Sequence, residues 1–265
     1  MMDCLESKVQ NDLKASEVCS FLAEYASWLL GCGATCIRIE KNVERIARAF
    51  GMEVDLMIMP SHIQISVCQS LHTDACECIK KIHKTGISFD INTQLSKLSW
   101  DIADKKVNFQ EALKIFNHIT QTKPENQWRV LVLASLANLA FCRLFNGDWI
   151  AMLVVFMATL MGYRLKQILL SYKVDVRVVF FCSAFLSSVI AAGACLFLWG
   201  NTPETALATS VLYLIPGIPY INSVSDMIDG HYICAFSRFM DSAILTICLS
   251  MGLCGGLLLM RLELF

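Results

Sequence analysis

The residues with the clearest chemical potential surround a break in an apolar segment. The stretch LIPGIPYINSVSDMIDGHY places Pro216, Gly217 and Pro219 at the end of an apolar run. Proline removes a backbone hydrogen bond and biases the preceding residue out of the helical region, so a helix cannot continue through this motif. Lipid cannot satisfy the freed backbone groups. We therefore expect the break to face protein or a polar cavity.

Polar side chains that could bind an anion or a proton follow the break. A helix that starts near Tyr220 would present open N–H groups with positive dipole character, and Asn222 and Ser223 add side-chain donors. Discontinuous helices of transporters hold a substrate carboxylate in this way. The expected substrate and ion pathway contains Pro216, Gly217, Pro219, Asn222, Ser223, Asp226, Asp229, Arg238 and Asp241.

The charged members of this set have different expected roles. Asp226 shares a helix face with Asn222, because four residues separate them. Acids inside a membrane often carry protons, so Asp226 or Asp229 is the candidate for protonation. Arg238 and Asp241 are three residues apart and could pair on one helix. A plain proline kink stays open as the alternative, with Asp226 and Asp229 in a wet loop and Asp241 capping the last helix.

The elements that must position these residues divide the chain in two. Of the 265 residues 55% are hydrophobic, and the mean hydropathy is +0.53, whereas soluble domains are about 45–50% apolar. Two thirds of the charged side chains lie in residues 1–128. We expect an α-helical polytopic membrane bundle with an N-terminal cytosolic α+β domain, arranged as a flexible N-terminus (1–15), the cytosolic domain (16–128) and a transmembrane domain (129–265). The net charge of −1 gives no reason to expect a nucleic acid partner.

Hydrophobic periodicity predicts the elements of the N-terminal domain. Apolar residues recur at helical spacing in four segments and alternate in three short ones. The predicted order is helix, helix, strand, strand, strand, helix, helix, over residues 16–30, 35–50, 54–59, 63–67, 78–82, 91–103 and 109–120. The first 15 residues are polar and lack a secretory signal, so we expect a cytosolic N-terminus.

Five apolar runs predict about five membrane spans, one of them discontinuous. They cover residues 130–145, 149–163, 178–199, 203–229 with the break at 216–219, and 240–260. The loop that follows residue 163 is rich in Lys and Arg, which places it and the N-terminus on the cytoplasmic side of the membrane. Small residues recur every fourth position and predict close helix packing, at Ser183, Ser187 and Ala191 and at Gly252 and Gly256.

Sequence patterns for enzymes, cofactors and metals are weak. Histidine and cysteine gather in one region, but their spacing is not that of a zinc site; they are His62, Cys68, His72, Cys76, Cys78 and His83. Neither a phosphate-binding loop nor a nucleophile elbow is present. We expect no catalytic residues, no cofactor and no metal.

Two separated motifs resemble the threonine/serine exporter (ThrE-like) family. The first is GCGATCIRIEKNVERIARAFGMEVDLMIMPSHIQISV, over residues 31–67, and the second is PGIPYINSVSDMIDGHYICAFSRF, over residues 216–239. FCRLFNGDW, over residues 141–149, is also similar. The second motif departs from the family pattern at Tyr220, where an aliphatic residue is usual, and at Ser225, where Arg is frequent.

The resemblance implies a subunit of a secondary exporter of small carboxylated metabolites, either threonine and serine or a dicarboxylate such as succinate. Export would draw on an ion gradient, with protons as the expected ion. The chain resembles the YjjP-type half of the family, which implies a second small membrane subunit of the YjjB type and an oligomeric assembly. A membrane-anchored cytosolic enzyme or sensor and a passive channel stay open as alternatives.

Overall fold

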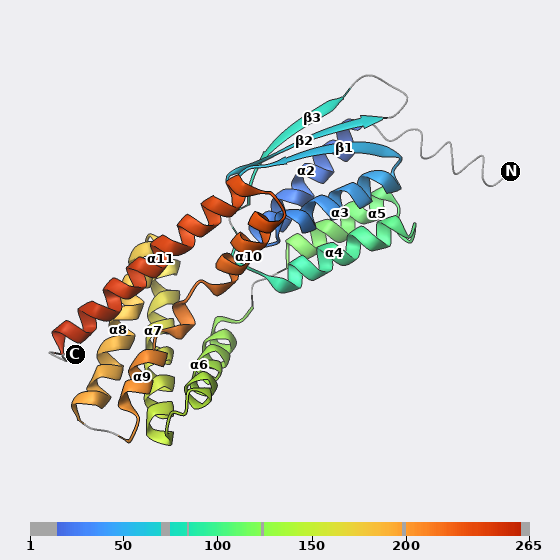
Figure 1. The fold of residues 1–265 in the computed structure, drawn as a ribbon. Coiled ribbons are helices and arrows are strands. Elements are labelled where there is room, and N and C mark those ends of the chain that lie inside the picture. Colours follow the sequence, from blue (N-terminus) through green and yellow to red (C-terminus); the bar gives the residue numbers. More distant parts are fainter. Residues whose placement is uncertain (1–14, 70–74, 84, 123–124, 198–199, 261–265) are drawn as a thin grey trace. The chain divides into compact units, whose positions relative to one another are not determined.

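The computed structural model describes residues 15–69, 75–83, 85–122, 125–197 and 200–260. The described chain is mostly helical and contains one small antiparallel sheet (Figure 1). Its contacts form two compact units. Unit 1 comprises Met1–Lys123 and Ile218–Phe239, and unit 2 comprises Pro124–Gly217 and Met240–Phe265. Each unit is therefore built from two separate parts of the chain.

The sheet of unit 1 has the strand order β1-β2-β3, with both neighbouring pairs antiparallel. Its strands are β1 (Met52–Ile58), β2 (His62–Gln69) and β3 (Cys76–Lys81). Leu56 pairs with Ile65, and Ile65 pairs with Cys78. On β2 the side chains of Ile63, Ile65 and Val67 are buried, as expected for the face of a half-buried sheet.

Four helices of unit 1 complete the element order that the sequence predicts for residues 16–120. They are α2 (Ala15–Gly31), α3 (Cys36–Ala49), α4 (Phe89–Ala103) and α5 (Phe109–Thr120). The starts of α4 and α5 are fixed by side-chain caps, because Ser88 accepts a hydrogen bond from the Ile91 N–H and Asn108 forms a capping box with Glu111. Local sequence therefore determines where these helices begin.

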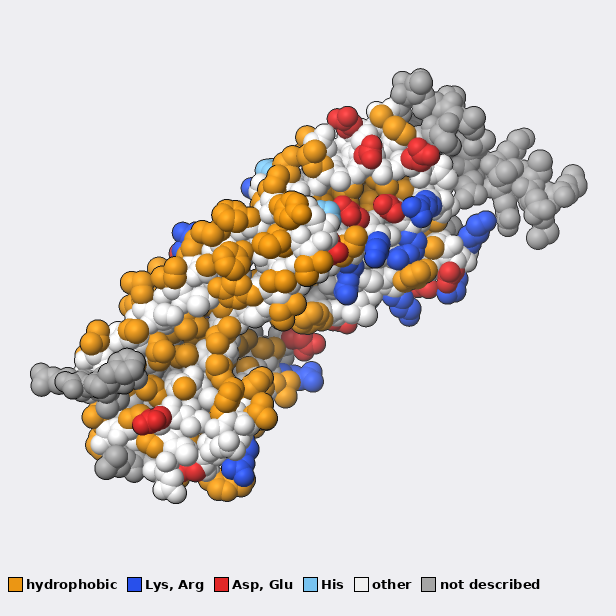
Figure 2. All heavy atoms as spheres, viewed as in Figure 1, with side chains coloured by type: hydrophobic (Ala, Val, Ile, Leu, Met, Phe, Trp, Pro, Cys, Tyr) orange, Lys and Arg blue, Asp and Glu red, His pale blue; other side chains and the backbone are white. Residues whose placement is uncertain are grey.

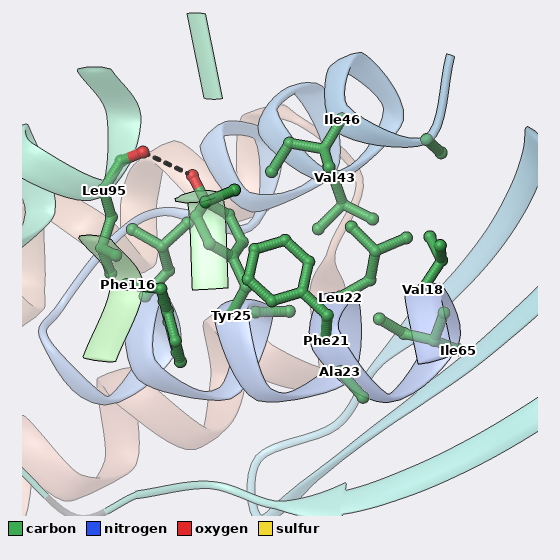
Figure 3. Close-up of a cluster of buried hydrophobic side chains, with 14 of the residues drawn as sticks. Val18, Phe21, Leu22, Ala23, Tyr25, Val43, Ile46, Ile65, Leu95 and Phe116 are labelled. Carbon is green, nitrogen blue, oxygen red and sulfur yellow. Dashed lines mark hydrogen bonds between the residues drawn. The ribbon is translucent and has the colours of Figure 1, made fainter. Parts of the chain in front are cut away.

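The core of unit 1 is organised around the buried side chains of α2 (Figure 3). Phe21 packs edge-on against Phe109 and Phe116, with ring centroids 5.7 and 5.6 Å away. Tyr25 is fully buried, and its hydroxyl donates to the Leu95 carbonyl oxygen at 2.8 Å. This bond satisfies a polar group that would otherwise be costly to bury.

Two later elements also belong to unit 1. They are α10 (Gly217–Ile228), from Ile218 onward, and the first eight residues of α11 (Tyr232–Leu259), which end at Phe239. The sequence places residues 218–239 in the transmembrane domain that it predicts from residue 129 onward. Their contacts group them instead with Met1–Lys123, because side chains of α10 and α11 bind the backbone of the chain just before α3.

The described elements of unit 2 are all helices, joined by short turns. It contains α6 (Gln127–Leu144), α7 (Trp149–Ser171), α8 (Val176–Leu196), α9 (Pro203–Thr209), the 3-10 turn η1 (Leu212–Leu214) and α11 from Met240 onward. The helix α7 continues eight residues beyond the predicted end of the second span at residue 163. Most of the basic segment that the sequence assigns to a loop is therefore helical.

Small residues allow close helix packing in unit 2, as the sequence predicts. Ser183, Ser187 and Ala191 are fully buried on α8. A side chain added at Gly252 of α11 would collide with the backbone at Phe181, and one at Gly256 would collide with Ser188. Only glycine permits this approach of α11 to α8.

Three helices of the described chain are long and apolar enough to cross a membrane: α7, α8 and α11. A fourth candidate exists if the segment from Pro203 to Leu214 and α10 together form one interrupted span. The helix α6, which contains the predicted first span, is not among these candidates. Hydrophobic side chains dominate the visible surface of α11 (Figure 2). The exposed hydrophobic residues of this helix include Met251, Leu258 and Leu259.

Candidate functional site

The helix break lies at Ile215 and Pro216, at the start of the predicted interval 216–219. The turn η1 ends at Leu214, Ile215 is extended, and α10 begins at Gly217. The new helix starts three residues earlier than the expected Tyr220, because Pro219 fits into a first helical turn where no N–H is needed. The first half-helix is shorter than predicted: α9 ends at Thr209 instead of continuing to Ile215.

Asp226 is the most deeply buried acid of the predicted set. Its side chain is fully buried within unit 1. One carboxylate oxygen accepts a hydrogen bond from the backbone N–H of Cys36 at 2.7 Å, and the other accepts from the Arg238 guanidinium at 2.8 Å. Cys36 is the first residue of α3, so the carboxylate also lies at the positive end of a helix dipole.

Arg238 and Asn222 bind the same short loop. A second guanidinium nitrogen of Arg238 donates to the Ala34 carbonyl oxygen at 2.8 Å, and the Asn222 amide donates to that of Gly33 at 2.8 Å. Gly33 has φ +86°, a conformation that glycine adopts without strain. We call Asn222, Asp226 and Arg238, with the loop backbone from Gly33 to Cys36, the anchor cluster.

Further contacts connect α10 and the first turns of α11. The Ser223 hydroxyl is buried and donates to the Ala235 carbonyl oxygen at 2.7 Å. The Cys234 thiol donates to the Ile58 carbonyl oxygen at the end of β1, at 3.3 Å. The imidazole of His231 lies 3.4 Å from the Glu40 carboxylate. The first bond joins the two arms of the α10–α11 hairpin, and the other two contacts hold the hairpin to β1 and α3.

The thiol of Cys36 does not have the properties of a nucleophile. A hydrogen bond with the Cys234 thiol raises the pKa of Cys36 far above its usual value, and burial raises it further. Reactive cysteines need a lowered pKa, because the thiolate is the nucleophile. Cys36 therefore contributes its backbone N–H to the anchor cluster rather than a reactive sulfur.

The remaining residues of the predicted pathway lie elsewhere. Asp229 is exposed, and the described hydrogen bond of its carboxylate is one from the Ser225 hydroxyl at 3.5 Å. Asp241 is exposed in unit 2, to which the buried Pro216 and the partly buried Gly217 also belong. The spacing of Arg238 and Asp241 would allow the two to pair, and the described ion pair of Arg238 is with Asp226.

The side chain of Tyr220 has a packing role. The Tyr220 ring meets the Phe239 ring nearly edge-on, with centroids 5.8 Å apart. Both residues belong to unit 1. An aromatic residue here adds a contact between α10 and α11 that an aliphatic side chain would make less specifically.

Sequence patterns missed a polar cluster in unit 2. Asn138 of α6 is buried, and its amide donates to the Thr159 hydroxyl of α7 at 2.6 Å and to the Thr209 carbonyl oxygen at 3.1 Å. Thr209 ends α9, so the amide satisfies a carbonyl that the early helix end leaves free. An Asn inside a predicted membrane span was the available signal.

Metal ligands do not come together in the part of the chain that is described. No group of three or more His, Cys, Asp or Glu there could hold a metal ion. His83 instead contacts the Glu24 carboxylate at 2.7 Å, and the Cys19 thiol donates to the Cys76 carbonyl oxygen. His72 lies outside the described residues.

Comparison with known proteins agrees with the two motifs. The family model ThrE, described as "Putative threonine/serine exporter", matches residues 20–260. The "Probable succinate transporter subunit YjjP" of Klebsiella aerogenes is 28% identical over 233 residues, which cover 86% of this chain and 88% of that protein. The protein of the same name from Escherichia coli (strain K12) is 28% identical over 228 residues, or 85% and 88%.

A more distant relative is longer. The "Probable threonine/serine exporter" of Mycobacterium tuberculosis is 19% identical over 247 residues, which cover 92% of this chain and 46% of that protein. No solved structure matches the chain. The family and these relatives are named as transporters and not as enzymes.

Proposed function

Because the chain belongs to the threonine/serine exporter family, we propose that it is a subunit of a secondary, proton-coupled exporter of small carboxylated metabolites. The candidates are threonine and serine or a dicarboxylate such as succinate. The names of the relatives support both classes. Export would use an ion gradient, since no nucleotide-binding loop occurs in the sequence.

In this proposal the chain is a multi-pass protein of the bacterial cytoplasmic membrane with a cytosolic N-terminus. Five spans would comprise α6, α7, α8, the interrupted segment from Pro203 to Ile228, and α11. Three of these helices, or four with the interrupted pair, have the required length and hydropathy. The relatives of similar length are called subunits, so we further propose a partner of the YjjB type and an oligomeric assembly.

One observation carries the assignment of the pathway: the buried ion pair of Asp226 and Arg238 just after a helix break. Buried charge pairs are costly to desolvate and are weak evidence for stability alone. A buried charge pair can instead be retained because it opens when one partner changes its charge and so acts as a switch. We propose that the pathway includes Pro216, Gly217, Pro219, Asn222, Ser223, Asp226, Asp229, Arg238 and Asp241.

Between the two candidate acids, we propose that Asp226 takes up the proton. Protonation of Asp226 would remove the negative charge that binds Arg238 and caps α3. Arg238 could then bind the carboxylate of a substrate bidentately. Protonation of Asp229 would disturb only a 3.5 Å contact with the Ser225 hydroxyl. Among the described contacts, protonation of Asp226 would therefore affect a second charged group, Arg238, whereas protonation of Asp229 would not.

The proposal is tested by transport in vesicles that contain the chain and its partner. Vesicles loaded with labelled succinate or threonine should release the label faster when a proton gradient is imposed. Asp226→Asn keeps the shape of the side chain but cannot bind a proton, so it should abolish the stimulation by the gradient while the protein still inserts. Asp229→Asn should retain the stimulation.

The control is Asp55→Asn, which removes an exposed carboxylate on β1. It should transport like the unchanged chain. Gradient-stimulated release from the Asp226→Asn variant would refute the assignment of this acid. Release that ignores the gradient in the unchanged chain would indicate a passive channel, and ligand binding without release would indicate a sensor.

A further inference from the structure

A lysine of α7 lies in an unusual position within unit 2. The Lys166 side chain is partly buried, and its ammonium lies 4.9 Å from the centre of the Phe180 ring and 5.5 Å from that of Tyr163. Within the described ranges no Asp or Glu forms an ion pair with Lys166. The aromatic faces compensate only part of the cost of burying an ammonium.

The hydroxyl groups of Tyr213 and Ser187 lie next to Gly162, one helical turn before Lys166 on the same face of α7. The Tyr163 ring contacts the Tyr213 ring, with centroids 5.9 Å apart, and the Tyr213 hydroxyl lies 2.9 Å from that of Ser187. Gly162 makes room for them, because an added Cβ there would collide with both hydroxyls. Tyr163 and Lys166 are three residues apart and lie on one helix face.

The facing side of α8 contains an unsatisfied polar group. The Ser183 hydroxyl is fully buried and has no hydrogen-bond partner among the described residues. Ser183 follows Phe180 by three residues and precedes Ser187 by four, so all three lie on one face of α8. A buried hydroxyl without a partner costs about 1–3 kcal/mol, which a ligand with an acceptor oxygen would recover.

We propose that Lys166 of α7, with the hydroxyls of Tyr213 and Ser183, forms a binding site for the carboxylate of a small organic acid. The ammonium would pair with the carboxylate, and the Ser183 hydroxyl would donate to one of its oxygens. The Tyr213 hydroxyl, which donates to the Ser183 carbonyl oxygen at 3.5 Å, would exchange that bond for one to the ligand. Charge-assisted bonds of this kind are the strong ones. The inference rests on the proposed function and names residues of unit 2 that lie outside the pathway given above.

The test measures binding of labelled succinate and of labelled threonine to the full chain. The chain is co-purified with its partner and held in nanodiscs of neutral phosphatidylcholine. Lys166→Gln should weaken the affinity about tenfold to a hundredfold, the factor expected for loss of one charge-assisted bond. Lys166→Arg should retain most of the affinity, since it keeps the charge. Tyr213→Phe, which removes only the hydroxyl, should weaken binding by a smaller factor.

The matched control is Lys173→Gln, which removes an exposed lysine just after α7 and should leave the affinity unchanged. Equal affinity of the Lys166→Gln variant and the unchanged chain would overturn this site and leave the proposed function intact. If the unchanged chain binds neither acid, both proposals fail. If Lys166 proves necessary only for retention of an anionic lipid added to the nanodiscs, the site binds a headgroup phosphate and the inference is overturned.

Discussion

Removal of Arg238 should loosen the start of α3, because it leaves a fully buried carboxylate without its ion-pair partner. The Asp226 side chain has no exposed surface, and that of Arg238 is only 18% exposed. Breaking a buried pair from one side costs about 3–5 kcal/mol. The Cys36 N–H still contacts Asp226, and the α3 dipole still favours the charge. We therefore expect Arg238→Gln to destabilise the anchor cluster by about 3 kcal/mol, at the lower end of that range.

The readout is hydrogen exchange at the Cys36 amide, measured by mass spectrometry on the full chain. This N–H donates directly to the Asp226 carboxylate, so its protection reports local opening of the anchor cluster. A loss of about 3 kcal/mol corresponds to exchange faster by about 150-fold. The double variant Arg238→Gln/Asp226→Asn should cost less than the sum of the single changes, because no buried carboxylate remains to be stranded.

The control is Arg48→Gln on α3, the helix that begins at Cys36. Arg48 pairs with Glu44, and the two side chains are 78% and 50% exposed, so its loss should cost at most about 1 kcal/mol. If Arg238→Gln accelerates exchange at Cys36 no more than Arg48→Gln does, the reasoning is wrong. Strict additivity in the double variant would also refute it, since the two charges would then not interact.

Three further predictions concern residues away from the anchor cluster. Burial alone raises the pKa of Glu24, but hydrogen bonds from His83 and Lys80 outweigh this effect and hold the pKa below the usual 4.5. The resulting stabilisation is present above pH 4.5 and is lost as the pH falls further. Glu24→Gln should therefore flatten the decrease in Tm that is measured at acid pH. Tyr25→Phe should lower the free energy of unfolding by about 1–2 kcal/mol, because the buried Leu95 carbonyl oxygen loses its donor; an unchanged denaturation midpoint would contradict this. Gly162→Ala should lower Tm through a cost of about 1–3 kcal/mol, because the new methyl group collides with the Tyr213 and Ser187 hydroxyls, whereas Gly193→Ala on α8 meets no atom within 4 Å and should not.

The sequence predicts well those features that depend on neighbouring residues. The order of the seven elements over residues 16–120 follows from hydrophobic periodicity and from glycines at the helix ends. The break near Pro216 follows from the missing N–H of proline and its steric effect on the preceding residue. The family is identified from two motifs, because these contain uncommon residues in a fixed order.

The partners of the polar residues could not be predicted, because they depend on contacts between distant parts of the chain. Asp226 contacts Cys36, which is 190 positions earlier. Its pairing with Arg238 across 12 positions requires the hairpin that forms when α10 ends and the chain turns at Gly230, where φ is +87°. A pattern within one helix, such as the three-residue spacing of Arg238 and Asp241, favours a local pair and misses the hairpin.

The hairpin also explains why the polar residues of the second motif are spaced as they are. Asn222 and Asp226 lie one helical turn apart, so both can contact the Gly33–Cys36 loop from α10. Arg238 contacts the same loop from α11 and neutralises the acid that caps α3. A loop that only needed to be held in place could be bound by neutral amides, as Asn222 does. Under the proposed function, the costly pair of buried charges would make the attachment sensitive to a proton or a competing carboxylate, which is the property that a coupled exporter requires.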